Sequence, residues 1–480
     1  MSFNKKKFIN KNGEERVYNK ETGENRYLRY FYRENGKTYY MSHDKDDLNC
    51  HADELFKDGL NKYNYFELFD GYKGSKEGII KYMKDFKESC DTLLKDGIFY
   101  KKYYNHKSAA TLTFVRFSNM KKNSISINNK KVRLENINFK ESYVLEKCHN
   151  AGLCCLDEKY KDDVIKCYGY DYGAFYPHIL SKSDLKIATT KPEFKKLSQD
   201  KFMKKLSKGK LKYGVYNVKI TIKECNNKTS PSQFYKKFSF SSDDWYTHID
   251  LSYAYSQKDN FELDFKINEQ TKDYNTMIYD KDDLIDSKVI FESWYDKLKS
   301  MKDKNKNMLI KHLMSSIWGY LCEHKKLYYN QEEFMKLNDE DVSDITDKNN
   351  TKYKVLKEKM SIDSDDNIKI NFTLIDKEQP YKYNIARMKP FLMSYCRCFV
   401  AEMIDREGIL NDIIRIHTDG IVLNRKHEFK DEYKPLKESK TTGNILWKNT
   451  NTYFHKCKKC KRLYSHRTNK LMGKDEMHEC

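Results

Sequence analysis

Proline, glycine and long apolar runs are scarce in this sequence, and each scarcity excludes a class of protein. Only 6 prolines and 18 glycines occur among 480 residues, which excludes collagen-like and proline-rich architectures and glycine-rich linkers. No apolar run is long enough to span a membrane, and the N-terminus, Met1-Ser-Phe-Asn-Lys-Lys-Lys, lacks an apolar signal core. The 13 cysteines form no disulfide framework. We therefore expect a soluble, intracellular protein with reduced thiols and no membrane partner.

Charged and aromatic residues are plentiful. The chain has 91 basic and 71 acidic residues, a net charge of +20, and its 14% aromatic content argues against disorder. The positive charge is uneven, because residues 201–240 hold 11 lysines and one acidic residue. Since lysine and arginine release counterions from phosphates, this distribution predicts a polyanionic partner. The competing interpretation is an ordinary solvated surface.

Local patterns predict several elements. Helices are expected over 52–70, over 76–95 and, as one or two segments, over 291–323. The stretch Ser124–Val132 reads as a hairpin that turns at Asn-Asn, and a pair of strands is expected near 211–223.

The first segment that suggests chemistry follows a predicted strand from Val164 to Asp171. Pro177 suits the first turn of the next helix, so Asp171 falls where the strand becomes a turn. A carboxylate in that place is suited to a hard cation such as Mg²⁺. An ordinary strand-end aspartate is the competing interpretation.

The second segment is Lys311-His-Leu-Met-Ser-Ser-Ile-Trp-Gly319. On a helix, Lys311, Ser315 and Trp318/Gly319 share one face, while Leu313 and its neighbours form an apolar stripe. A lysine beside a small and an aromatic residue is suited to binding a nucleotide, whose phosphate and base such side chains can contact. An amphipathic helix with one solvated lysine explains the same pattern.

The third segment, Ile413–Leu423, has two β-branched runs around Asp419-Gly420, which predicts a hairpin turning at those two residues. A turn favours Asp-Gly in any case. If Asp171 and Asp419 lie on neighbouring strands, however, they can bind two divalent ions for in-line phosphoryl transfer.

Together these segments resemble family B DNA polymerases. Asp171-x-x-x-x-Tyr-Pro resembles motif A (D-x-x-S-L-Y-P), Lys311-x-x-x-Ser-Ser-x-Trp-Gly resembles motif B (K-x-x-x-N-S-x-Y-G), and His417-Thr-Asp-Gly resembles motif C (D-T-D-S). They occur in the family's order. His149-Asn-Ala-Gly152 is similar to the Y-x-G-G linker of the protein-primed branch, found in viruses and mobile elements. The resemblance covers about 146–425.

The resemblance implies template-directed DNA synthesis from dNTPs with two Mg²⁺ or Mn²⁺ ions, on a DNA primer–template or from a terminal protein primer. Asp171 and Asp419 would hold both ions with the Tyr172 carbonyl, and Lys311 would pair with nucleotide phosphates, helped by Lys299. Tyr176 would exclude a 2′-hydroxyl, and the nascent base pair would be lined by Ser315, Ser316, Trp318, Gly319 and Thr418. The expected DNA contacts are His149, Asn150, Gly152, Lys201, Lys204, Lys205, Lys208 and Lys210.

The implied fold is α+β: a right hand with an antiparallel-sheet palm, helical fingers and a small thumb, beside a separate N-terminal mixed α/β region. The expected division is 1–145 of unknown role, 146–180 linker and motif A, 181–290 basic insertion and palm, 291–323 fingers, 324–380 second insertion, 381–425 palm with motif C, and 426–480 thumb and basic tail.

The sequence also departs from the family. His417 stands in place of the first acid of motif C, and no D-x-E precedes Asp171, so we expect no proofreading exonuclease. Two alternatives stay open: a degenerate palm that binds nucleic acid without catalysis, and a template-independent or primer-making nucleotidyltransferase. In the tail, the types and spacing of four residues suggest a zinc site, with a basic reduced tail as the alternative; the four are Cys457, Cys460, His478 and Cys480.

Overall fold

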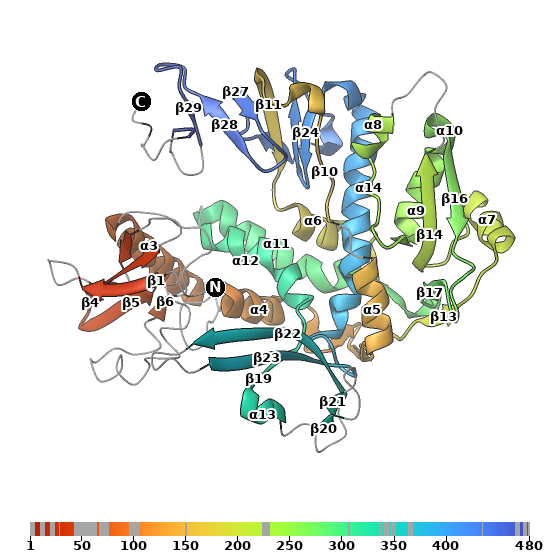
Figure 1. The fold of residues 1–480 in the computed structure, drawn as a ribbon, viewed down its shortest axis with the longest axis horizontal. Coiled ribbons are helices and arrows are strands. Elements are labelled where there is room, and N and C mark those ends of the chain that lie inside the picture. The colour runs from red at the N-terminus through yellow and green to blue at the C-terminus, as the bar shows by residue number, and fades with distance from the viewer. Residues whose placement is uncertain are drawn as a thin grey trace. The chain divides into compact units, whose positions relative to one another are not determined.

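The computed structural model of this chain consists of two compact units (Figure 1). The first combines residues 1–122 with 292–382, and the second combines 123–291 with 383–480. Within 1–105 and 336–367, the structure describes the strands and helices that are named below. In the rest of the chain it describes residues 106–148, 151–222, 231–305, 308–335, 368–433, 435–465, 471–473 and 478.

The first unit has two groups of strands and a set of helices. The N-terminal strands are β1 (Lys5–Ile9), β2 (Glu15–Asn19), β3 (Asn25–Tyr27), β4 (Arg29–Glu34), β5 (Lys37–Ser42) and β6 (Tyr65–Phe66). A five-stranded antiparallel sheet contains β19 (Lys326–Asn330), β20 (Asn338–Asp339), β21 (Ile345–Thr346), β22 (Lys352–Ile362) and β23 (Ile368–Asp376). The helices are α3 (Lys76–Lys95), α4 (His106–Phe117), α12 (Met308–Leu321) and α13 (Gln331–Met335), and α11 (Ser287–Asn305) crosses the boundary between the units.

Helix α12 packs against α4 through the apolar stripe that the sequence predicts. Leu313, Ile317 and Leu321 are all buried, and Ile310 joins them. The opposite face of α12 therefore remains available to solvent, and Lys311 lies on it.

The second unit is built around an eight-stranded antiparallel sheet, in which strands distant in the sequence are neighbours. Its strands are β10 (Cys154–Leu156), β24 (Ile413–His417), β25 (Gly420–Leu423), β11 (Val164–Tyr172), β27 (Gly443–Trp447), β28 (Tyr453–Lys456) and β29 (Leu463–Tyr464), in this spatial order, with β26 (Leu436–Glu438) also paired to β11. The first half of β11 pairs with β27, and its second half lies between β25 and β26. A buried cluster that includes Cys167, Ile414 and Trp447 covers one face of this sheet.

A long helix, α14 (Lys389–Glu407), supports the sheet and is the blue helix that runs vertically in Figure 1. Pro390 occupies its first turn and Gly408, with φ 63°, ends it, as the preferences for helix termini predict. Residues on all sides of α14 are buried because it packs against α6 (Phe175–Lys182), α5 (Phe139–Lys147) and α9 (His248–Ser256).

The remaining elements form smaller sheets and connections. A five-stranded antiparallel sheet contains β13 (Glu193–Lys195), β14 (Gly214–Ile222), β15 (Trp245–Thr247), β16 (Leu263–Ile267) and β17 (Thr276–Ile278). Two strand pairs are β8 (Ser124–Ile127) with β9 (Lys130–Arg133), and β12 (Lys186–Ala188) with β18 (Leu284–Asp286). The further helices are α7 (Gln199–Ser207), α8 (Pro231–Tyr235) and α10 (Lys258–Phe261).

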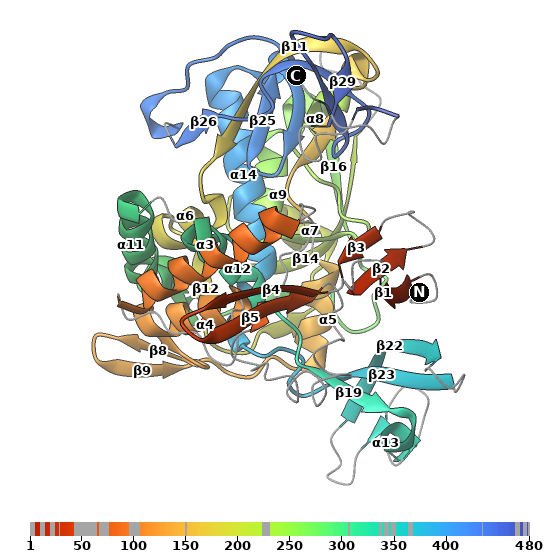
Figure 2. The same cartoon turned by 90° about the vertical axis from the view of Figure 1, so that its left-hand side faces the viewer.

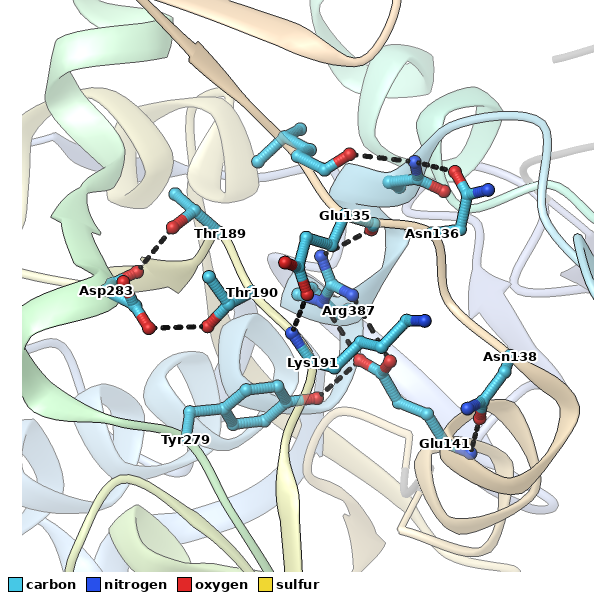
Figure 3. Close-up of polar contacts among 12 residues, drawn as sticks. Glu135, Asn136, Asn138, Glu141, Thr189, Thr190, Lys191, Tyr279, Asp283 and Arg387 are labelled. Atoms are coloured by element: carbon cyan, nitrogen blue, oxygen red, sulfur yellow. Dashed lines mark hydrogen bonds and ion pairs between the residues drawn. The ribbon is translucent and has the colours of Figure 1, made fainter.

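A buried ion pair ties α5 to the segment that leads into α14 (Figure 3). The Arg387 and Glu141 side chains are both fully buried, and Arg387 Nε donates to Glu141 Oε1 at 2.9 Å. The Tyr279 hydroxyl donates to the same carboxylate oxygen at 2.9 Å. Because every charged atom here has a partner, the hydrogen bonds and the ion pair offset the desolvation cost of burying these charges.

The sequence predictions of local structure are largely confirmed. Helix α3 covers 76–95, 291–323 contains most of α11 and all of α12, and the β8–β9 hairpin (Figure 2) turns at Asn128 and Asn129, whose φ values are 47° and 63°. The helix expected over 52–70 is wrong at 65–66, where strand β6 lies, and the rest of that stretch lies outside the described residues. The strand pair expected near 211–223 is wrong, because a single strand, β14, fills that stretch and pairs with three others. The α+β class with predominantly antiparallel sheets is observed, while the palm, fingers and thumb layout stays a prediction.

Candidate active site

The two aspartates singled out in the sequence lie on adjacent strands of the second unit. Asp171, near the end of β11, pairs directly with Gly420, the first residue of β25. The Tyr172 N–H donates to the Asp419 carbonyl at 3.0 Å. A Cβ atom added to Gly420 would lie 2.6 Å from Asp171 Oδ1, so the carboxylate of Asp171 rests over the start of β25. The fold therefore brings together two acidic residues that are far apart in the sequence.

The turn that carries Asp419 differs from the predicted one. His417 pairs with Gly420, so Thr418 and Asp419 are the two central residues, and Asp419-Gly420 does not form the turn. Thr418 has φ 61°, a backbone conformation that is unfavourable for a β-branched residue. Strain of this kind costs about 1–3 kcal/mol and persists only where the surroundings impose it.

The surroundings of the turn explain how it is held. The Thr418 N–H donates to the Leu153 carbonyl at 2.7 Å. Gly152 is buried against Thr418, and a Cβ atom at Gly152 would lie 3.0 Å from Thr418 Oγ1 and Cγ2. Gly152, expected to contact DNA, thus has a steric role here, since a side chain would press against Thr418. His149 and Asn150 lie outside the described residues.

A buried charge network supports the 151–153 loop from behind. Arg397 Nη1 donates to the Ala151 carbonyl at 2.9 Å, and Arg397 Nη2 donates to Asp250 Oδ2 at 2.9 Å. Both side chains of this ion pair are only 3% exposed, and Ser394 Oγ donates to the same carboxylate. Burial acts against the charge of Arg397, but the facing Asp250 raises the pKa of the guanidinium above its usual value. The network therefore connects α14 to the turn at Thr418 through one loop.

Tyr176 and Tyr172 flank the aspartates in different ways. Tyr176 is half-buried; burial and the nearby Cys396 and Asp419 raise the pKa of its hydroxyl, while a hydrogen bond with Thr418 acts in the opposite direction. The Tyr172 ring is buried, with its centroid 5.1 Å from that of Phe175. Only the main chain of Tyr172 is therefore available to a ligand.

Two cations near Asp171 were not predicted from the sequence. Lys437 on β26 pairs directly with Asp171, and opposed residues of antiparallel strands place their side chains on the same face. Arg415 is buried, and burial lowers the pKa of its guanidinium although Asp171 acts to raise it. Its Nε donates to the Thr450 carbonyl at 2.6 Å. No local pattern marks either residue, because their place depends on strand register.

The helix that carries Lys311 belongs to the first unit. Lys311, Ser315 and Gly319 are exposed on one face of α12, and Trp318 is half-buried beside them. The hydroxyls of Ser315 and Ser316 donate to carbonyl groups of their own helix, to Lys311 at 2.9 Å and to His312 at 2.6 Å. Lys299 is exposed on α11. The shared face of motif B is therefore observed, and its convergence with the aspartates stays a prediction.

The basic tract of 201–240 divides into two kinds of lysine. Four of the expected DNA contacts are exposed on α7 and the turn after it, and Lys205 is half-buried; the exposed four are Lys201, Lys204, Lys208 and Lys210. Lys236 and Lys237 are instead buried in ion pairs, with Asp157 at 2.7 Å and Asp405 at 2.6 Å. Part of the positive charge thus stabilises the fold.

Three of the four expected metal ligands in the tail lie close together. The ligand atoms of Cys457, Cys460 and His478 are within 4.8 Å of one another, and Cys480 lies outside the described residues. His417, which stands where the family has an acid, contacts Asn451 Oδ1 through Nε2 at 3.0 Å.

No protein-family model and no curated protein matches this chain. Among solved structures it is similar to Phi29 DNA polymerase complexed with primer–template DNA and incoming nucleotide substrates, with 14% identity, a TM-score of 0.43, and coverage of 86% of this chain and 58% of that chain. The complex of that polymerase with single-stranded DNA gives 14% identity, a TM-score of 0.47, and coverage of 92% and 71%. In the first match the chain spans less than two thirds of the polymerase. Similarity at this level assigns no function to this chain.

None of the described helices combines the length and the apolar composition that crossing a bilayer requires.

Proposed function

We propose that this chain is a metal-dependent DNA polymerase that adds deoxynucleotides to a 3′-hydroxyl on a template. The observation that carries the proposal is the pairing of Asp171 with the strand that follows Asp419. Two carboxylates carried on paired strands could hold the two metal ions of nucleotidyl transfer, and backbone strain of the kind seen at Thr418 often occurs at active sites. The resemblance of three segments to motifs A, B and C indicates that the substrates are deoxynucleotides and a DNA template.

The residues present fit magnesium. Mg²⁺ prefers oxygen ligands and is usually bound by one or two carboxylates, with water and substrate phosphates completing its shell. Asp171 is exposed and Asp419 half-buried, so both leave room for water and phosphate ligands, and no sulfur or imidazole ligand is needed. Bound magnesium would activate the 3′-hydroxyl and offset the charge that develops on the α-phosphate.

The chain's own residues would place the reactants. In the reaction, the 3′-oxygen bonds to the α-phosphorus, the bond to the β-phosphate oxygen breaks, and pyrophosphate leaves. Lys311 would bind the phosphates of the incoming nucleotide and lower the electrostatic cost of transfer. Tyr176, held beside Thr418 and Asp419, would lie under the sugar and exclude a 2′-hydroxyl. Lys437, on the face of Asp171, would contact a further phosphate.

Primer extension tests the proposal. The wild-type chain is incubated with a primer–template, dNTPs and Mg²⁺ or Mn²⁺, beside Asp171→Asn and Asp419→Asn, which keep side-chain size. The matched control is Asp162→Asn, because Asp162 lies just before the start of β11 and its side chain forms an ion pair with Lys448 on the surface. We expect templated extension by the wild type and the control, and loss of at least ~10³-fold in both site variants.

Other outcomes separate the remaining functions. DNA binding without incorporation by the wild type would identify a non-catalytic nucleic-acid-binding palm. Incorporation that ignores the template would identify a template-independent or primer-making enzyme. Supplying a protein hydroxyl in place of a DNA primer tests the protein-primed branch that the Gly152 segment resembles.

A further inference from the structure

The C-terminal tail contains a cluster of metal-ligating side chains that the polymerase reaction does not use. Strand β28 ends immediately before Cys457, and three residues later Cys460 returns to the same place. Cys460 Sγ and His478 Nε2 are 3.5 Å apart, and the ligand atoms of all three residues lie within 4.8 Å of one another.

The backbone between the two cysteines is folded into a tight knuckle. The Cys457 N–H donates to the Arg462 carbonyl at 2.9 Å, and the Lys461 N–H donates to the Cys457 carbonyl at 3.1 Å. Lys461 has φ 61°, which lets the chain reverse toward β29. The main-chain N–H groups of Cys460 and Lys459 point at the Cys457 sulfur.

The histidine is held by packing and not by proximity in sequence. The His478 ring stacks on Tyr464 of β29, with centroids 4.1 Å apart and planes at 5°. Tyr464 is itself fixed opposite His455 in the β28–β29 pair. A ring placed in this way presents Nε2 to the two sulfurs.

We propose that Cys457, Cys460 and His478 bind one structural Zn²⁺ ion. Zinc takes thiolate sulfur at ~2.3 Å and imidazole nitrogen at ~2.0 Å, so ligand atoms of one tetrahedral site lie roughly 3.3–3.8 Å apart. The observed separations need only small shifts of flexible side chains to reach these values. The sequence offers Cys480, two residues after His478, as the fourth ligand.

Zinc has a structural consequence in this place. Strand β29 has only two residues, so a bound metal ion would add bonds that hold this short strand in place. The bound ion would fix a turn that exposes four cations to solvent; these are Lys458, Lys459, Lys461 and Arg462.

The test measures metal content in the full-length chain, purified under reducing conditions after expression with added zinc. We expect one zinc per chain by elemental analysis, and loss of that zinc in Cys457→Ser, Cys460→Ser and His478→Gln. Cys154→Ser is the matched control, because Cys154 is exposed and outside the cluster, and it should keep the metal. Replacement by Co²⁺ should give the visible absorption bands of a tetrahedral cobalt–thiolate site.

Two results would overturn the proposal. One is a reduced wild-type chain, with its cysteines as free thiols, that neither contains zinc nor takes it up on titration. The other is zinc that persists in the Cys457→Ser/Cys460→Ser double variant. Neither depends on polymerase activity, and Asp171→Asn should keep its zinc, so failure of this proposal and failure of the proposed function are distinguishable.

Discussion

Removing the charge of Arg397 tests how the fold holds the turn at Thr418. In Arg397→Met the stem of the side chain remains but Asp250 stays buried without its partner. The lost contacts include two hydrogen bonds from Nη2 to the Asp250 carboxylate, at 3.0 and 2.9 Å, and the 2.9 Å bond to the Ala151 carbonyl. An uncompensated buried charge of this kind costs about 3–5 kcal/mol. At about 2–4 °C per kcal/mol for a unit of this size, we expect Tm to fall by roughly 6–20 °C.

Arg387→Met is the matched control. Arg387 forms a buried pair with Glu141 in the same unit, so its removal should cost a similar free energy of unfolding. Arg387 makes no contact with the 151–153 loop among the interactions described for it, whereas Arg397 binds Ala151 directly. Only the Arg397 variant should therefore loosen the turn.

Hydrogen exchange and catalysis distinguish the two variants below their melting temperatures. The Thr418 N–H, bonded to the Leu153 carbonyl, should exchange faster in Arg397→Met and at the wild-type rate in Arg387→Met. Primer extension should fall in the first variant more than in the second. Equal exchange at Thr418 in both variants, or a wild-type Tm in Arg397→Met, would refute this explanation of the strained turn.

Three further predictions concern single residues. Burial lowers the pKa of His248 from its ordinary 6.5 to about 4, so His248 is neutral in the folded state at neutral pH. Its contribution to the free energy of unfolding is therefore complete above pH 6.5 and is lost as the pH falls toward 4. Urea unfolding should show up to about 3 kcal/mol less stability at pH 4 than at pH 7, and a shallower dependence in His248→Gln. Lys437→Ala should weaken primer–template binding and reduce the slope of log K against log [salt] by about 0.9, and an unchanged slope would exclude a phosphate contact. Gly169→Ala should cost about 1–3 kcal/mol in thermal unfolding, because a Cβ atom there would lie 1.9 Å from Thr441 Oγ1; an unchanged Tm would show that the loop moves freely.

Local sequence patterns predicted the elements that depend on neighbouring residues. The apolar periodicity of 76–95 gives α3, and Asn128 and Asn129 tolerate the positive φ of a tight hairpin turn. The same reasoning misplaced the turn before β25, because it assumed that Gly420 supplies the unusual backbone conformation. The fold imposes that conformation on Thr418 instead, through Leu153 and the space left by Gly152.

The residues that sequence reasoning missed all depend on contacts distant in the chain. Lys437 reaches Asp171 only because β26 pairs with β11 in one register. Arg397 and Asp250 find each other across 147 positions, and nothing in either segment signals the other. Lys236 belongs to a basic tract that reads as a surface, yet its ammonium is buried against Asp157. Such pairings follow from packing, which local composition does not encode.

The most direct test of the central claim is a count of metal ions at the two aspartates. Mn²⁺ binding can be followed by electron paramagnetic resonance on the wild type, Asp171→Asn and Asp419→Asn, with primer–template and a non-hydrolysable dNTP analogue. If Asp171 and Asp419 share a site, the wild type will bind two spin-coupled ions about 4 Å apart, and either substitution will abolish the coupling. Two uncoupled ions, each lost in only one variant, would contradict the account.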